Sequence, residues 1–178
     1  MIGLKRGTVK LSPYSTECVI YFEKGKNLLQ NTLGPLILDI QHVGSTSIPD
    51  MPSKPIIDIV VGIKTVNDFG ECIKLLQNAG YLLRENASNC RELCFAKGSE
   101  EKRTYYLQLV KYHGEIWNNY LAFRDYLRTN KESAQQYAFL KQRLSANFAD
   151  NRVKYTEGKA DFIHKTIKTA RNISLSTS

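Results

Sequence analysis

The chain has 178 residues, the size of a single domain, and 42% of them are hydrophobic, which is enough for a substantial core. Lys and Arg number 25 and Asp and Glu 17, so the net charge is +8 and anionic partners are favoured. The composition excludes an intrinsically disordered chain. The basic residues are scattered and the tyrosines mostly follow core spacing, which argues against nucleic acid as a partner.

The sequence shows no targeting or membrane-spanning pattern. The opening stretch "MIGLKRGTVK" has no apolar core, and no segment approaches the roughly 20 apolar residues that a membrane span requires. The four cysteines are expected to be reduced thiols. We therefore expect a cytoplasmic protein with no membrane partner.

The spacing of apolar residues predicts alternating strands and helices along the first two thirds of the chain. The predicted strands are Leu36–Val43, Pro55–Ile63, Tyr81–Arg84, Glu92–Ala96 and Thr104–Val110. The predicted helices are Thr16–Asn31, Val66–Asn78, Glu115–Arg128, Glu132–Phe148 and Thr156–Arg171. In the first helix we expect Val19, Phe22 and Leu29 to point inward.

This order of elements indicates an α+β fold. Pro55–Ile63 is β-branched and almost wholly apolar, so it should lie at the centre of a mixed sheet with both faces covered. The last third of the chain should form a C-terminal helical segment. We expect one domain over residues 1–172, followed by a flexible Ser-rich tail at 173–178.

The stretch "HVGSTSIPDMPSKPIIDIVV" carries most of the functional information. Gly44, Ser45 and Thr46 form a small-residue turn, whose backbone N–H groups and hydroxyls can approach a phosphate closely. Twelve residues separate Ser45 from Asp58, which lies in the apolar strand. An unpaired carboxylate in such a strand is costly, so Asp58 needs a metal, a cation or backbone donors as partners.

Several basic residues are candidates to accompany Asp58. Lys54 precedes it by four residues, while Arg124 and Arg128 share one face of a predicted helix, where two guanidinium groups suit a phosphate or a carboxylate. A network of salt bridges between helix and sheet is the alternative for these arginines. His42 is a candidate to contact a phosphate or orient Ser45, or else it packs; Lys141 is a further candidate for the same cleft.

The turn and the strand acid resemble the hallmark of the polymerase-β type of nucleotidyltransferase. That hallmark is a hydrophobic residue, Gly and Gly or Ser, then some ten residues, then Asp, a hydrophobic residue and a second acid. Val43–Ser45 and Asp58 match it, whereas Val60 stands at the position of the second acid. In that superfamily two acids on one strand and a third on a neighbouring strand hold magnesium.

A closer resemblance, to the GrpB family, covers nearly the whole chain. The same stretch is similar to the signature of that family, and "LAFRDYLR" (121–128), "YAFLK" (137–141) and "KYTEGKADFI" (154–163) look like its later helices. The family is placed by fold among the nucleotidyltransferases, so the resemblance implies a nucleotidyltransferase-like mixed sheet flanked by helices.

The chain departs from the family at its fifth strand. The typical strand reads Thr-His-His-Leu-His-Val, whereas "TYYLQLV" places Tyr105, Tyr106 and Gln108 at the histidine positions. Tyr and Gln can hydrogen-bond a base or a sugar, but Gln is a poor magnesium ligand beside a carboxylate. Any contact that the histidines make to a metal or substrate is therefore changed.

Two functional hypotheses follow. The first is a nucleotidyltransferase that uses Mg²⁺ and an NTP, in which Ser45 holds a phosphate, Asp58 the metal, and Arg124 and Arg128 further charge. The second is a module that binds a nucleotide or another anion without turnover, or that contacts a partner protein. The sequence specifies neither the acceptor nor the oligomeric state.

Overall fold

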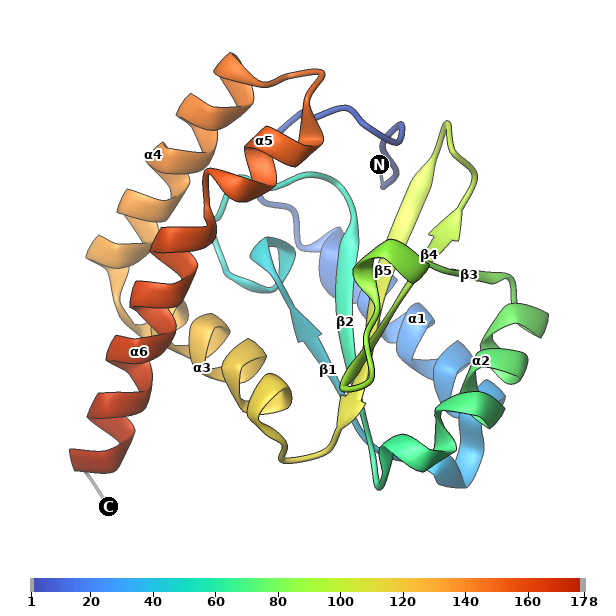
Figure 1. Ribbon diagram of the computed structural model, residues 1–178. Coiled ribbons are helices and arrows are strands. Elements are labelled where there is room, and N and C mark those ends of the chain that lie inside the picture. The colour runs from blue at the N-terminus through green and yellow to red at the C-terminus, as the bar shows by residue number, and fades with distance from the viewer. Residues whose placement is uncertain (1, 177–178) are drawn as a thin grey trace.

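Five strands form one mixed sheet in the order β1-β2-β5-β4-β3, which confirms the α+β expectation (Figure 1). The computed structural model describes residues 2–176. β2 and β5 pair in parallel at the centre, and the other neighbours are antiparallel. The strands are β1 Ile37–Val43, β2 Ile57–Ile63, β3 Tyr81–Leu83, β4 Glu92–Gly98 and β5 Arg103–Lys111.

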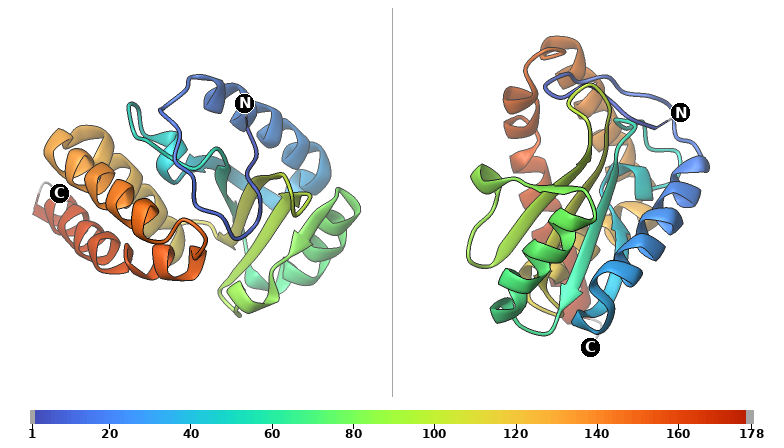
Figure 2. Two further views of the ribbon diagram at one scale, coloured as in Figure 1. Left: turned by 90° about the horizontal axis from the view of Figure 1, so that it is seen from above. Right: turned by 90° about the vertical axis from the view of Figure 1, so that its right-hand side faces the viewer.

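Helices cover both faces of this sheet. Seen from above in Figure 2, α1 and α2 lie on one side of the sheet, and α4 and α6 stand on the other. The helices are α1 Glu17–Leu33, α2 Phe69–Asn78, α3 Glu115–Thr129, α4 Lys131–Asn147, α5 Arg152–Glu157 and α6 Ala160–Ser176. A short 3-10 turn, η2 (Ser45–Ser47), follows β1. No helix within residues 2–176 is long and apolar enough to cross a membrane.

The alternation of side chains along β2 divides the molecule into two parts. Ile57 and Ile59 are fully buried in the main core, which also contains the inner faces of α1 and α2. Burial of each such side chain contributes roughly 1.5–3 kcal/mol. Asp58 and Val60 point to the opposite face, where Val60 packs with Trp117 of α3. Asp58 thus lies on the sheet face that α3–α6 cover.

Two details of the helices differ from the sequence expectation. Val19 is 48% exposed, because the buried face of α1 runs through Phe22 and Leu29 instead. The predicted last helix is divided into α5 and α6. Gly158 lies at this break, and a Cβ there would come within 2.6 Å of Leu144 Cδ2 of α4, so a larger residue would require the Leu144 side chain to shift.

The C-terminal prediction falls partly outside the described residues. α6 continues to Ser176, so the backbone of residues 173–176, predicted to begin a tail, is helical. Residues 177–178 lie outside the described part of the chain, and the flexibility of the tail stays a prediction.

Candidate functional site

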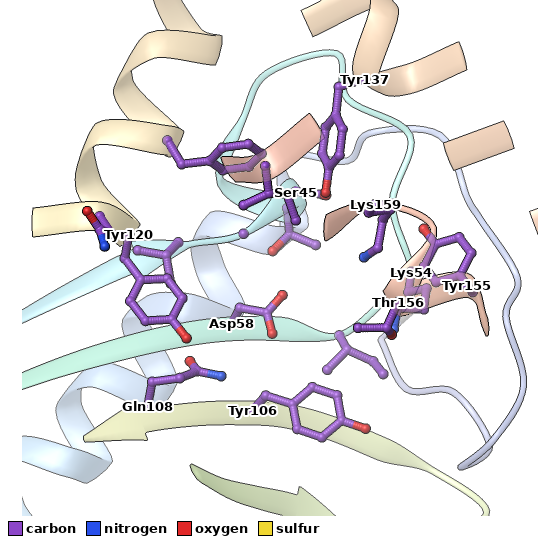
Figure 3. Close-up of a pocket in the computed structure, with 18 of the residues that line it drawn as sticks. Ser45, Lys54, Asp58, Tyr106, Gln108, Tyr120, Tyr137, Tyr155, Thr156 and Lys159 are labelled. Atoms are coloured by element: carbon purple, nitrogen blue, oxygen red, sulfur yellow. The ribbon is translucent and has the colours of Figure 1, made fainter. Parts of the chain in front are cut away.

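A cavity of about 460 Å³ lies between one end of the sheet and the C-terminal helices (Figure 3). The end of β1, the turn after it, the first residues of β2, and β5 form its floor, and residues of α3–α6 form its walls. Its charged side chains in the described chain are one carboxylate, Asp58, and three cations, Lys54, Arg152 and Lys159. The charged wall is therefore predominantly basic.

The turn and the acid are in direct contact. Val43 and Asp58 pair across β1 and β2, which brings Gly44 over the Asp58 side chain. Gly44 has φ +69°, and a Cβ there would lie 2.5 Å from Asp58 Oδ2. The Ser47 hydroxyl donates to the Gly44 carbonyl at 2.7 Å and closes the turn. Gly44, Ser45 and Thr46 all line the cavity, as the sequence motif predicted.

Asp58 has cations around it but no close ion pair. Within the described residues, no Lys or Arg nitrogen lies within 4.0 Å of its carboxylate. Burial raises the pKa of Asp58, and the positive charges of Lys54, Lys159 and Arg152 oppose this shift only in part. The predicted nearness of Lys54 to Asp58 is therefore confirmed, although the two do not form a tight pair.

Burial favours the neutral form of the two cavity lysines. Burial, followed by the charge of Arg152, lowers the pKa of Lys54 to about 7. Burial lowers the pKa of Lys159 to about 8, although Asp58 opposes this shift. Both ammonium groups lie over the ring of Tyr155, at 5.6 and 4.5 Å from its centroid. An anion bound in the cavity would supply the negative counter-charge that the two ammonium groups lack.

Tyrosines form much of the remaining wall: Tyr106, Tyr120, Tyr137 and Tyr155. The Tyr137 hydroxyl lies beside Ser45 (Figure 3), and the Tyr120 hydroxyl donates to Glu92 Oε1 at 2.7 Å. Sequence reasoning considered Tyr106 as a ligand contact but assigned Tyr120, Tyr137 and Tyr155 to packing and missed their place in the wall. For Tyr106 a signal was present, because it pairs with Asp58 in the β2–β5 register and alternation then puts it on the cavity face.

Arg124 and Arg128 do not line the cavity, which corrects their assignment as phosphate ligands beside Asp58. Arg124 Nη1 donates to Gln41 Oε1 at 2.8 Å and to the His42 carbonyl at 3.0 Å. Arg128 donates from Nε and Nη2 to the Ser47 carbonyl, at 2.9 and 2.7 Å. The two guanidinium groups therefore tie α3 to the end of β1 and to the turn through hydrogen bonds, and not through the salt bridges between helix and sheet that were the alternative, because their ion pairs are with Asp125 of α3 itself.

His42 and Lys141 also lie behind the cavity wall, so their assignment as direct ligands is not supported by the geometry. The His42 ring stacks on Phe22, with centroids 4.8 Å apart, and its Nε2 is 3.0 Å from Thr46 Oγ1. Burial and the nearby arginines lower the pKa of His42 to about 4, which keeps the ring neutral. Lys141 is 1% exposed and donates to the Pro52 carbonyl. Both residues brace the loop between β1 and β2.

Gln108 lies where the sequence placed it, on β5 opposite Val60 and facing the cavity. Figure 3 shows Gln108 and Tyr120 on one side of Asp58, and Lys54 and Lys159 on the other. Gln108 Oε1 is buried without a hydrogen-bond partner in the described structure. Such an orphaned acceptor costs about 1–3 kcal/mol.

These residues do not fit a resident Mg²⁺ ion. Magnesium takes an octahedral set of oxygen ligands, usually with at least one or two carboxylates. Here Asp58 is the cavity's one carboxylate among the described residues, and three cations surround it. The described residues also contain no group of three His, Cys, Asp or Glu side chains placed to hold a metal ion.

Two curated proteins illustrate what this chain resembles in sequence. The chain is 33% identical over 171 residues to the glutamate-rich protein GrpB of Alkalihalophilus pseudofirmus, and the match covers 94% of this chain and 98% of that protein. It is 31% identical to UPF0157 protein YqkA of Bacillus subtilis, with 92% of this chain matched to 47% of the relative, so the chain spans about half of that protein.

Solved structures give the same result for the fold. The crystal structure of conserved protein GrpB from Enterococcus faecalis matches with a TM-score of 0.85 at 29% identity, over 93% of this chain and 99% of that one. The MgGTP-bound Cid1 poly(U) polymerase matches with a TM-score of 0.50 at 10% identity, over 75% of this chain and 44% of that one. The second similarity concerns the fold alone and makes the sheet nucleotidyltransferase-like.

A family model described as GrpB protein matches residues 8–169, which include every element from α1 to α5 and most of α6. That range contains the turn, the strand acid and each cavity residue described above. The chain therefore belongs to the GrpB family.

Proposed function

We propose that the cavity binds a nucleotide or another phosphorylated small molecule, and that lysine and arginine side chains hold its phosphate directly. The observation that carries this proposal is the convergence of Lys54, Lys159 and Arg152 on one cavity beside the Gly44–Ser45 turn. When Lys54 and Lys159 are protonated, the three positive charges exceed the single negative charge that Asp58 can carry. A phosphate group in the cavity would balance the excess positive charge and would accept hydrogen bonds from ammonium groups and from backbone N–H groups.

The rest of the cavity suits the non-phosphate part of such a ligand. Its volume of about 460 Å³ lies within the range of small-molecule sites. Tyr106, Tyr120 and Phe123 supply aromatic surface against which a base or another flat group can pack. The Gln108 side chain adds a polar amide to this part of the wall.

Magnesium-dependent nucleotidyl transfer from an NTP to an acceptor is the second candidate. It is favoured by the position of Asp58 directly under the Gly44 turn, on a nucleotidyltransferase-like fold. The basic surroundings of Asp58 and the lack of a second carboxylate favour binding without metal. Magnesium thus stays a prediction, and a protein-interaction role is the remaining alternative.

Calorimetric titration with ATP, GTP, CTP and UTP, each with and without Mg²⁺, separates these functions. If cations hold the phosphate, binding does not require Mg²⁺ and Lys159→Gln weakens it by about tenfold or more. Asp58→Asn should then leave the affinity unchanged or raise it, because it removes a negative charge from an anion site. Arg143→Gln, on the exposed surface of α4, is the control for an equal loss of net charge.

The opposite result for Asp58 would contradict the proposal. If binding needs Mg²⁺ and Asp58→Asn abolishes it, the carboxylate holds a metal and the second candidate is favoured. If none of the four nucleotides and no inorganic phosphate binds, the cavity is not a phosphate site.

A further inference from the structure

A second cavity, of about 380 Å³, lies beside the first on the same face of the sheet. Tyr106 and Arg152 line both cavities, so they form the wall between them. Ala96 of β4 pairs with Tyr106 of β5 and lines the second cavity. This cavity therefore lies on the β3 side of the first one. Its charged lining residues are Arg6, Arg84, Glu85, Glu100, Arg103 and Arg152.

Two of the four arginines already have partners within the protein. Arg6 forms an exposed ion pair with Glu100. Arg103 is 5% exposed and its Nη1 donates to the Gly98 carbonyl at 2.8 Å, while its backbone N–H donates to the Leu4 carbonyl. These contacts engage Arg6 and Arg103 within the protein, so Arg84 and Arg152 are the arginines to consider as ligand donors.

Arg84 and Arg152 flank Tyr106. Their guanidinium carbons lie 5.1 and 4.6 Å from the centroid of the Tyr106 ring, and Arg152 Nη1 donates to the Tyr106 hydroxyl at 2.5 Å. Within the described residues neither arginine has a carboxylate within 4.0 Å. The two guanidinium groups lie near enough to repel each other and form no ion pair, although Glu85 also lines this cavity.

We propose that this second cavity binds a phosphate group through Arg84 and Arg152, beside the group bound in the first cavity. Guanidinium forks bind phosphate oxygens through paired N–H donors, and Arg84 and Arg152 both line this cavity beside the Tyr106 ring. Because Arg152 borders both cavities, the site can take either a second phosphorylated molecule or a second phosphate of the first one. The chemistry is the same for both sources.

The inference goes beyond the proposed function, since it requires no ligand in the first cavity. Amide nitrogen–proton correlation spectra resolve the two sites separately while inorganic phosphate is titrated at low ionic strength. We expect two groups of shifted amides, one at Gly44–Thr46 and the other at Arg84–Ala87. Arg84→Gln should weaken the second response by about tenfold or more and leave the first in place.

Matched variants keep the test decisive. Arg84→Lys retains the charge but loses the fork, so its second response should lie between those of wild type and Arg84→Gln. Arg143→Gln should preserve both responses, and each spectrum also reports whether the variant is folded. Amides at Arg84–Ala87 that stay unmoved in the wild type, or that move equally in Arg84→Gln, would overturn the inference.

Two further outcomes distinguish this inference from the proposed function. If only the second group of amides responds, the proposed function fails and the second site stands; if only the first responds, the reverse holds. Titration with inorganic pyrophosphate identifies the source of the second phosphate. One equivalent that shifts both groups indicates a single ligand across both cavities, and two equivalents indicate two molecules.

Discussion

Replacing Gly44 by alanine should destabilise the protein through two separate effects. Gly44 has φ +69° and ψ −172°, a region essentially restricted to glycine, which costs a residue with a side chain about 1–3 kcal/mol. The new Cβ would also lie 2.5 Å from Asp58 Oδ2 and 2.9 Å from Asp58 Cβ, and such overpacking costs about 1–3 kcal/mol. Together we expect a loss of about 4 kcal/mol in the free energy of unfolding.

Urea and thermal unfolding measure this loss. For a chain of this size about 4 kcal/mol corresponds to a fall in Tm of roughly 8–16 °C. Gly70→Ala is the matched control: Gly70 is an exposed residue of α2, and its new Cβ would meet nothing within 4 Å. That change should stabilise the protein by up to about 1 kcal/mol.

A double-mutant cycle with Asp58→Ala separates the two effects. Asp58→Ala removes the Oδ2 and Cγ contacts at 2.5 and 3.0 Å but keeps the Cβ contact at 2.9 Å. The cost of Gly44→Ala should therefore fall by about 1 kcal/mol in the Asp58→Ala background, while the backbone strain persists. A Gly44→Ala variant as stable as Gly70→Ala would refute the reasoning about both the dihedral angles and the contact.

Three further predictions concern titration. Phosphate affinity, measured by calorimetry, should fall between about pH 6 and about pH 9, because Lys54 and Lys159 lose their protons at pKa values of about 7 and about 8; an affinity independent of pH would contradict this. The pKa of His42 is 6.5 in the unfolded chain and about 4 in the folded protein, so the unfolded state binds more protons between these values. The free energy of unfolding of the wild type should therefore fall by about 3 kcal/mol as the pH is lowered from about 6.5 to about 4. Urea unfolding of His42→Asn should show a smaller fall in the free energy of unfolding over the same pH range. Equal falls in the variant and the wild type would exclude His42 as the cause. Burial lowers the pKa of Lys141 to about 7, so its contribution to the free energy of unfolding rises from about pH 7 toward about pH 10, by up to about 1.4 kcal/mol per pH unit. Lys141→Met should lack this slope in a plot of unfolding free energy against pH. Parallel plots for the variant and the wild type would rule out this role of Lys141.

Local patterns determined the elements of the sheet and the position of the turn. The apolar run of β2 has one acid, and its period of two places Asp58 opposite the core while Ile57 and Ile59 enter it. Gly44 was predictable as a close-approach position from its place after β1. The break at Gly158 was not, because it depends on the contact with Leu144 of α4.

The hydrogen-bond partners of the long side chains depend on how the helices pack against the sheet. Arg124 and Arg128 share one helix face, as their spacing requires, but that face meets the β1 end and η2, whose carbonyls take the guanidinium donors. Lys141 is likewise drawn to the Pro52 carbonyl. Sequence spacing fixes which residues of a helix lie together, and it does not fix what a flexible side chain several bonds long will reach.

The sequence by itself determined the family, the α+β fold, and the adjacency of the Gly44–Ser45 turn to Asp58, because these follow from local periodicity and one contiguous motif. Only the tertiary structure decided the chemistry around Asp58. Arg152 begins α5 and Lys159 lies in the turn between α5 and α6, about 100 residues further along the chain, and their approach to the acid results from the packing of this segment over the sheet. A basic cavity around a single carboxylate is thus a property of the assembled layers.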